Sequence, residues 1–230
     1  MIDFDLLVEH FCQNSNKKYS EFNNTIINSS VPALGCTVPF VRKTAAEYKN
    51  RVDEVMELPS NVWHEVDMLK GIVVANAKLP FEQKTRLLTA FADTIQSWAI
   101  CDCSTVKIGK AELADYFGYF CNLLVSDKPF VCRYGVVNLM SSYLVETYIE
   151  QVFAKLGTIN LYAEYYVDMA VAWLLATAMS RFPTETKRYM EGDGRSVLNK
   201  STFNKALQKI RDSYRVSDED KDWTRRVKMQ

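Results

Sequence analysis

Glycine and proline are scarce in this chain of 230 residues, which contains only 8 glycines and 6 prolines. Folds built from β-strands alone need many tight turns, and tight turns depend on these two residues. The shortage therefore favours helices. Long apolar segments are also missing, since no run reaches the ~18–20 residues of a membrane span. The start of the chain carries the acids Asp3 and Asp5, where a secretory signal would have a basic region and an apolar core. We therefore expect a cytoplasmic protein without membrane association.

Metal ligands are few and poorly spaced. The only histidines are His10 and His64, and none of the six cysteines belongs to a Cys-x-x-Cys pair. Zinc sites usually require such pairs, or histidines at defined spacings. We therefore expect no metal and no cofactor. The cysteines are interpreted as small buried apolar residues with free thiols.

The chain has no excess of either charge, because 28 lysines and arginines balance 28 acids. A net charge of zero does not favour a nucleic-acid partner. The charges are distributed unevenly, however. Residues 181–230 hold 13 basic and 8 acidic side chains, a net charge of +5, and the rest of the chain has a net charge of −5. This C-terminal part would provide contacts to phosphate, although solvated helix faces explain the same charges.

Apolar residues recur with the period of a helix along most of the chain, and no segment sustains the period of two that strands show. The better-defined helices are expected at residues 2–14, 62–77, 80–95, 111–125, 130–140, 143–155, 161–179, 182–190, 199–214 and 217–228. Residues 191–194 are expected to form a turn. About a dozen helices joined by short loops are typical of a helical solenoid. No low-complexity linker divides the chain, so we interpret residues 1–230 as one domain and expect a monomer.

The most informative segment is Trp98-Ala-Ile-Cys-Asp102, within a helical stretch that Ser97 is expected to N-cap. Positions i and i+4 of a helix share one face. That face would present an indole beside a carboxylate, a pairing suited to a cationic or sugar-like group.

Related residues follow at regular distances. Trp63 lies 35 residues before Trp98, Arg133 lies 35 after it, and Trp173 lies 40 after Arg133. Distances of roughly 35–45 residues are the period of two-helix repeats such as HEAT units. A solenoid of such units can line up side chains on one concave wall. We interpret Trp63 as packing between repeats and Trp223 as a surface or capping aromatic.

Each candidate also has a structural interpretation. Helical tryptophans are more often buried in a core than catalytic, which applies to Trp98 and Trp173. Asp102 would then be a first-turn acid that the helix dipole favours, and Arg133 an exposed first-turn residue. The sequence is compatible with both sets of interpretations.

Five segments occur in the order and at the spacing of a known family. They are Gly35-Cys-Thr-Val-Pro39 with Arg42 and Lys43, Trp98-x-x-x-Asp102, Ser126-Asp-Lys-Pro-Phe-Val-Cys-Arg133, Tyr166-Val-Asp-Met-Ala-Val-Ala-Trp173, and Lys205-Ala-Leu-Gln-Lys209. Together they resemble the AlkD-type DNA alkylation repair family. The chain departs from the family pattern at Asp168 and Met169, and at Cys132, where basic residues are common.

The resemblance implies an all-α fold, a right-handed superhelical solenoid of HEAT-like two-helix repeats. It also implies a DNA glycosylase whose partner is double-stranded DNA carrying alkylated bases. The catalytic residues would be Asp102, Trp98 and Trp173, and the DNA-binding residues would be Arg133, Arg42, Lys43, Lys205 and Lys209.

The chemistry expected of such an enzyme is simple. A purine alkylated at N3 or N7 is already cationic and leaves readily, so the protein must stabilise positive charge on the sugar, a task for Asp102. Two alternatives remain: a non-catalytic protein of the same fold that binds DNA structures, and a helical scaffold that binds proteins.

Overall fold

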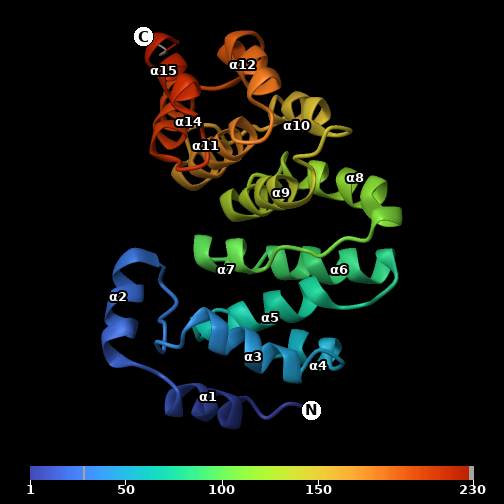
Figure 1. Ribbon diagram of the computed structural model, residues 1–230. Helices are drawn as coiled ribbons and strands as arrows, with labels where there is room; N and C mark the ends of the chain where they lie inside the picture. The colour runs from blue at the N-terminus through green and yellow to red at the C-terminus, as the bar shows by residue number, and fades with distance from the viewer. Residues whose placement is uncertain (28, 228–230) are drawn as a thin grey trace. The chain divides into compact units, whose positions relative to one another are not determined.

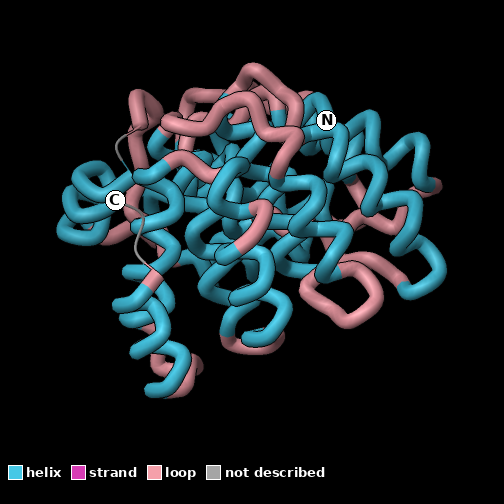
Figure 2. The backbone as a smooth tube through the Cα atoms, turned by 90° about the horizontal axis from the view of Figure 1, so that it is seen from above, coloured by secondary structure: helices cyan, strands magenta, loops and turns pink. Residues whose placement is uncertain are grey.

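The computed structural model describes residues 1–27 and 29–227. Within them the chain forms fifteen α-helices and one short 3-10 helix, and no strand (Figure 1). Short loops join the helices along the whole described length (Figure 2). The expected all-α class is therefore confirmed. Within the described ranges, no helix has the length and apolar character needed to cross a membrane.

Contacts divide the chain into two compact units, Met1–Lys107 and Ile108–Gln230. Each unit has its own buried core. The interpretation of residues 1–230 as one domain, and of the fold as a single superhelix, stays a prediction.

Unit 1 is built around one buried helix. It contains α1 (Phe4–Gln13), α2 (Lys17–Ile27), α3 (Val38–Glu47), α4 (Val52–Met56), α5 (His64–Asn76), α6 (Phe81–Ala92) and α7 (Trp98–Cys103). Helix α5 packs against α3, α4, α6 and α7, and all its residues except the last are buried. A helix that is covered on every side must satisfy its polar side chains internally.

The buried Glu65 of α5 satisfies its carboxylate through hydrogen bonds with the backbone of the loop before α3. Its carboxylate accepts hydrogen bonds from the backbone N–H groups of Leu34, Gly35 and Cys36, at 2.9, 2.8 and 3.0 Å. Gly35 has a φ of +104° in this loop, and a Cβ there would lie 2.4 Å from the Asn16 carbonyl oxygen. Only glycine tolerates this conformation and this contact.

Two further charged residues of α5 hold the loop that precedes it. The Lys70 ammonium donates to the Leu58 carbonyl and the Ser60 hydroxyl, both at 2.6 Å. The Asp67 carboxylate accepts from the backbone N–H of Asn61 at 3.0 Å. Asn61 has a φ of +63°, a conformation that asparagine adopts more readily than most residues.

Unit 2 is built around α11. It contains η1 (Lys110–Glu112), α8 (Leu113–Leu123), α9 (Pro129–Ser142), α10 (Ile149–Leu156), α11 (Tyr165–Met179), α12 (Pro183–Glu191), α13 (Gly194–Val197), α14 (Lys200–Asp212) and α15 (Asp218–Arg226). Helix α11 packs against α9, α12 and α14. The buried Asp168 of α11 accepts hydrogen bonds from the Thr202 hydroxyl at 2.5 Å and the Ala163 N–H at 3.1 Å. It therefore joins the start of α14 to α11.

Several predicted boundaries were wrong. Helix α10 begins at Ile149 rather than at residue 143, because Tyr143 turns inward and its hydroxyl donates to the Leu113 carbonyl at 2.7 Å. Helix α11 begins four residues later than predicted, because Ala163 has a φ of +91°. The predicted turn at residues 191–194 includes the last residue of α12 and the first of α13. Helix α4 was not predicted, and residue 228, the predicted end of the last helix, lies outside the described residues.

The interpretation of Trp223 was also wrong, because its side chain is buried. The indole N–H donates to the Glu191 carboxylate at 2.6 Å, and the Lys187 ammonium lies 6.0 Å from the ring centroid. Trp223 therefore packs α15 against α12. Of the cysteines, Cys12 is exposed and Cys103 is half-buried, which corrects the interpretation of all six as buried.

Candidate functional site

The short helix α7 carries Trp98 and Asp102 and is fixed at both ends. The Ser97 hydroxyl accepts from the N–H of Ile100 at 3.3 Å, which confirms the predicted N-cap. The buried Ser104 hydroxyl donates to the Ile100 carbonyl at 2.7 Å. Ile100 and Cys101 are fully buried, whereas Trp98 and Asp102 are half-buried. The helix thus anchors one face and leaves the Trp/Asp face partly accessible.

Helix α7 also approaches α5 closely, at Gly71. A Cβ at this position would lie 2.1 Å from the Ser104 hydroxyl oxygen and 2.3 Å from Cζ of Phe91. No side chain fits there without moving α6 or the end of α7. The absence of a side chain at Gly71 therefore sets the position of the helix that carries Trp98 and Asp102.

Trp98 and Asp102 line one cavity of about 150 Å³ in unit 1. Its other walls come from α2, α5 and the segment around the start of α3, and include Asn23, Cys36, His64 and Met68. The Trp98 indole N–H donates to the Ile26 carbonyl at 3.3 Å, which ties the ring to α2. Asp102 is the fifth residue of α7, so its interpretation as a first-turn acid is wrong.

A positively charged side chain lies beside this cavity. The Arg42 guanidinium of α3 lies close to the thiol of Cys103, the neighbour of Asp102, and favours its ionised form. Burial raises the pKa of Cys103 and the Asp102 carboxylate raises it further, while Arg42 opposes both effects. Arg42 and Lys43 are both exposed on α3. The structure therefore places one of the predicted DNA-binding residues next to the Trp/Asp pair.

His64 also lines this cavity, although no sequence motif indicates it. It is 3% exposed, and its Nδ1 has no hydrogen-bond partner among the described residues. Burial lowers the pKa of the imidazole and the neighbouring Glu65 opposes that shift, so the ring is neutral near pH 7. The sequence signal for His64 is its position next to Glu65, at the start of an apolar helix.

In unit 2, Arg133 is buried rather than exposed. Only 5% of its surface is accessible, and its guanidinium donates to the Tyr166 carbonyl at 2.8 Å. This bond joins α9 to α11. The interpretation of Arg133 as an exposed first-turn residue is therefore wrong, and its contact with phosphate stays a prediction.

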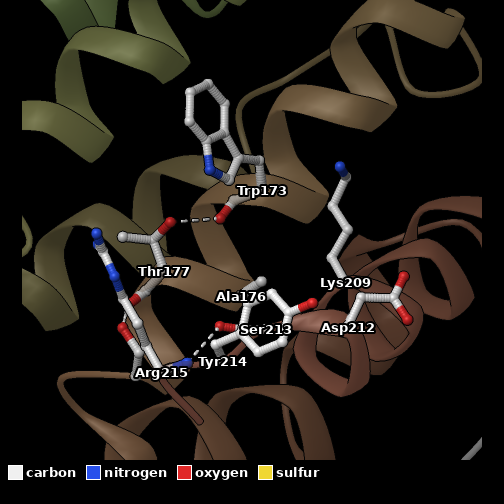
Figure 3. A pocket seen from close by; sticks show the side chains of 9 residues that line it. Trp173, Ala176, Thr177, Lys209, Asp212, Ser213, Tyr214 and Arg215 are labelled. Carbon is white, nitrogen blue, oxygen red and sulfur yellow. Dashed lines mark hydrogen bonds between the residues drawn. The ribbon is translucent and has the colours of Figure 1, made fainter.

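Trp173 is exposed on α11 and borders a larger cavity of about 510 Å³. Helix α14 and the segment that follows it supply the opposite wall, through Lys209, Asp212, Tyr214 and Arg215. In Figure 3 the side chains of Lys209 and Arg215 extend on opposite sides of Trp173. An indole that is 40% exposed is not a core residue, so the core interpretation of Trp173 is wrong.

The predicted site residues thus fall into two sets. Trp98, Asp102, Arg42 and Lys43 belong to unit 1, where the first three gather around one helix. Trp173, Lys205, Lys209 and the buried Arg133 belong to unit 2. In the described part of the chain, no group of three or more histidines, cysteines and acids is placed to hold a metal ion.

Residues 7–210 match the sequence family described as DNA alkylation repair enzyme. The chain belongs to this family. The match covers residues of both units, including every predicted site residue, and it supports a role in DNA repair. A comparison with curated proteins gives no significant match.

Proposed function

We propose that this DNA alkylation repair protein is a glycosylase that excises cationic purines alkylated at N3 or N7 from double-stranded DNA. The observation that carries the proposal is the shared cavity of Trp98 and Asp102. An indole face and a carboxylate on one short, firmly held helix suit a sugar that becomes positively charged. Membership in the DNA alkylation repair family supports alkylated DNA as the substrate class.

The reaction breaks the bond between the sugar C1′ and the purine nitrogen. The bond electrons go to the purine, which leaves as a neutral base because alkylation had made it cationic. Positive charge develops on the sugar, and Asp102 stabilises it. Two unit charges about 4 Å apart attract by about 4 kcal/mol at an effective dielectric constant of about 20. That energy corresponds to roughly a thousandfold in rate if it acts only in the transition state.

Water then completes the reaction. It adds to C1′ and releases a proton, and the Asp102 carboxylate can hold the attacking water by a hydrogen bond. Trp98 presents an indole face to the sugar and to the cationic base, and the exposed Trp173 of unit 2 presents another to the DNA. Arg42, Lys43, Lys205 and Lys209 contact backbone phosphates, and such contacts position the DNA without reading its sequence. No step in this scheme uses a metal or a cofactor.

The test is to incubate the purified chain with methylated DNA and to measure the released bases by chromatography. We expect release of N3-methyladenine or N7-methylguanine, and an excision rate roughly a thousandfold lower in Asp102→Asn. Asp53→Asn is the matched control, because Asp53 is an exposed acid on α4 of the same unit. Equal rates in the wild type and Asp102→Asn would refute the role of the carboxylate.

A second function is favoured by the burial of Arg133. A guanidinium that is bonded inside unit 2 gives DNA one charged contact fewer, and the chain has no net positive charge. Both facts fit a protein that binds DNA structures without excising bases. This alternative predicts that the wild type releases no base and yet binds DNA in a salt-sensitive manner. Absence of both release and binding would favour a protein-binding scaffold.

A further inference from the structure

Exposed aromatic side chains gather on one part of unit 2. Among the described residues, four large aromatics are exposed, and three of them, Tyr165, Trp173 and Tyr214, belong to this unit. Tyr165 is 59% and Trp173 40% exposed, and Tyr214 is fully exposed. Large apolar rings that face water are uncommon, and a group of them usually marks a binding surface.

The two rings on α11 share one helix face. Tyr165 and Trp173 are eight residues apart, which is about two helical turns and about 12 Å along the axis. Met169 lies midway between them and is half-buried. The rings are thus far enough apart to hold separate groups.

A cation accompanies each ring. The Lys205 ammonium of α14 lies 5.9 Å from the centroid of Tyr165, and it is oriented by the hydrogen bond that it donates to the Ser201 hydroxyl at 2.7 Å. Lys209, one turn further along α14, borders the same cavity as Trp173. We use the name α11–α14 strip for the surface formed by Tyr165, Trp173, Lys205, Lys209, Tyr214 and Arg215.

The strip ends in the 510 Å³ cavity between Trp173 and the segment after α14. Figure 3 shows Lys209 and Arg215 on its two sides and Trp173 between them. Asp212 is the one carboxylate among its lining residues. A cavity of this size falls within the range that holds small organic ligands, and one nucleotide is such a group.

Alternating rings and cations are the pattern that binds unpaired nucleotides. Proteins that hold single-stranded nucleic acid stack bases on aromatic side chains and follow the backbone with positive charges. A duplex hides the faces of its bases and offers this surface only phosphates. Three exposed rings therefore distinguish the strip from a surface that binds phosphate alone.

We infer that the α11–α14 strip binds a single-stranded segment of DNA, with bases against Tyr165, Trp173 and Tyr214 and phosphates against Lys205, Lys209 and Arg215. This binding goes beyond the proposed excision from duplex DNA and requires no catalytic residue of unit 1. It would place the protein on damaged DNA that contains unpaired nucleotides.

The first experiment measures binding of the full chain to fluorescently labelled oligothymidylate of about twelve nucleotides, a length within the range that such sites cover. Fluorescence anisotropy compares the wild type with the double variant Tyr165→Leu and Tyr214→Leu. We expect the variant to bind the single strand at least about tenfold more weakly, because stacking on each ring is lost. Binding to a duplex of the same length should change less than about twofold, since its bases are not available for stacking.

Phe22→Leu is the matched control, because Phe22 is the exposed aromatic of unit 1. It should leave both affinities unchanged. All three positions are exposed, so the variants should fold, and circular dichroism checks this. Unchanged binding of oligothymidylate in the double variant would overturn the inference, as would an equal loss for single strand and duplex, which is the behaviour of a phosphate-only surface.

The second experiment tests the cations. Lys205→Gln combined with Lys209→Gln should reduce the salt dependence of single-strand binding by about 1.4 in the log–log slope, about 0.7 for each phosphate that is no longer neutralised. Lys155→Gln removes the same kind of charge from an exposed position on α10 and should leave the slope unchanged. An unchanged slope in the double variant would count against the strip. Base excision from duplex DNA is measured separately, so a failure of this inference is distinct from a failure of the proposed function.

Discussion

Glu65 shows how one buried carboxylate can organise a candidate site. It is 1% exposed, and burial of an unpaired charge would be costly. Three backbone N–H groups surround it instead, and hydrogen bonds to an ionised acceptor are stronger than neutral ones. The same bonds fix the loop that supplies Cys36 to the cavity of Trp98 and Asp102.

We expect Glu65→Gln to lower the free energy of unfolding by about 2 kcal/mol, because the amide loses the charge and brings an N–H₂ group to one of the donors. Urea denaturation followed by circular dichroism measures the change. Glu47→Gln is the control, since Glu47 is an exposed acid on α3 and should have little effect. Equal denaturation midpoints for the two variants would show that the three bonds contribute nothing.

Asp67 gives a pH-dependent prediction. Burial raises its pKa from 3.8 to about 6, while the hydrogen bond from Asn61 and the charge of Lys70 oppose the shift. The folded state therefore keeps the proton to a higher pH than the unfolded chain does. By linkage, this carboxyl group makes folding less favourable as the pH rises from about 4 to about 6.

Asp67→Asn removes the titrating carboxyl group. The difference in the free energy of unfolding between the wild type and the variant therefore measures the effect of this group alone. The free energy of unfolding of the wild type, relative to the variant, should fall by about 2 kcal/mol between pH 4 and pH 6, since one pKa unit corresponds to about 1.36 kcal/mol. Urea denaturation at several pH values gives this difference. A difference that is constant over the range, or that grows with pH, would show that the pKa of Asp67 is not raised.

At the scale of an element, the position of helix α7 depends on a few neighbouring contacts. It has only six residues, too few for stability by itself. Its position depends on the Ser97 cap, on buried Ile100 and Cys101, and on the close approach at Gly71. The geometry of the Trp/Asp pair is therefore set by residues that do not line the cavity.

Two glycines allow a matched test. Alanine forms helices better than glycine by about 0.5–1 kcal/mol, but a Cβ at Gly71 clashes with Ser104 and Phe91, and overpacking costs about 1–3 kcal/mol. We expect Gly71→Ala to destabilise the protein and to reduce base excision. A Cβ at Gly118 on α8 would meet nothing within 4 Å, so Gly118→Ala should stabilise slightly. Thermal denaturation of both variants tests the contrast, which a gain in stability for Gly71→Ala would contradict.

The sequence predicted most helices and the pairing of Trp98 with Asp102, because both depend on local periodicity and caps. Prediction failed where contacts between residues that are distant in sequence determine the structure. The helix predicted from residue 143 begins only at Ile149, because the Tyr143 hydroxyl reaches Leu113. Trp223 is buried because α12 packs over it. The burial of Arg133 and the unpaired Nδ1 of His64 likewise depend on neighbouring helices that no local pattern reveals.

At the scale of the whole molecule, charge is balanced in total and divided between segments. The excess of basic residues lies in the C-terminal part, while Arg42 and Lys43 form a separate basic pair on α3 of unit 1. If both units contact duplex DNA as proposed, the Arg42–Lys43 pair and the Lys205–Lys209 pair each contribute to the salt dependence of duplex binding.

We expect Arg42→Gln with Lys43→Gln, and separately Lys205→Gln with Lys209→Gln, each to reduce the log–log salt slope of duplex binding by about 1.8, about 0.9 per neutralised phosphate. Anisotropy titrations at several salt concentrations measure it. Lys17→Gln with Lys18→Gln, on the exposed start of α2, should leave the slope unchanged. A change confined to one of the two predicted pairs would limit duplex contact to that unit.

The burial of Trp223 has a consequence for any shortened version of this chain. The family match ends at residue 210, whereas the bond from Trp223 to Glu191 closes unit 2 beyond that point. A chain cut at the end of the match would leave the face of α12 under Trp223 open to water. Such a product would spend more time partly unfolded, and cellular proteases and chaperones would remove it faster than the intact protein.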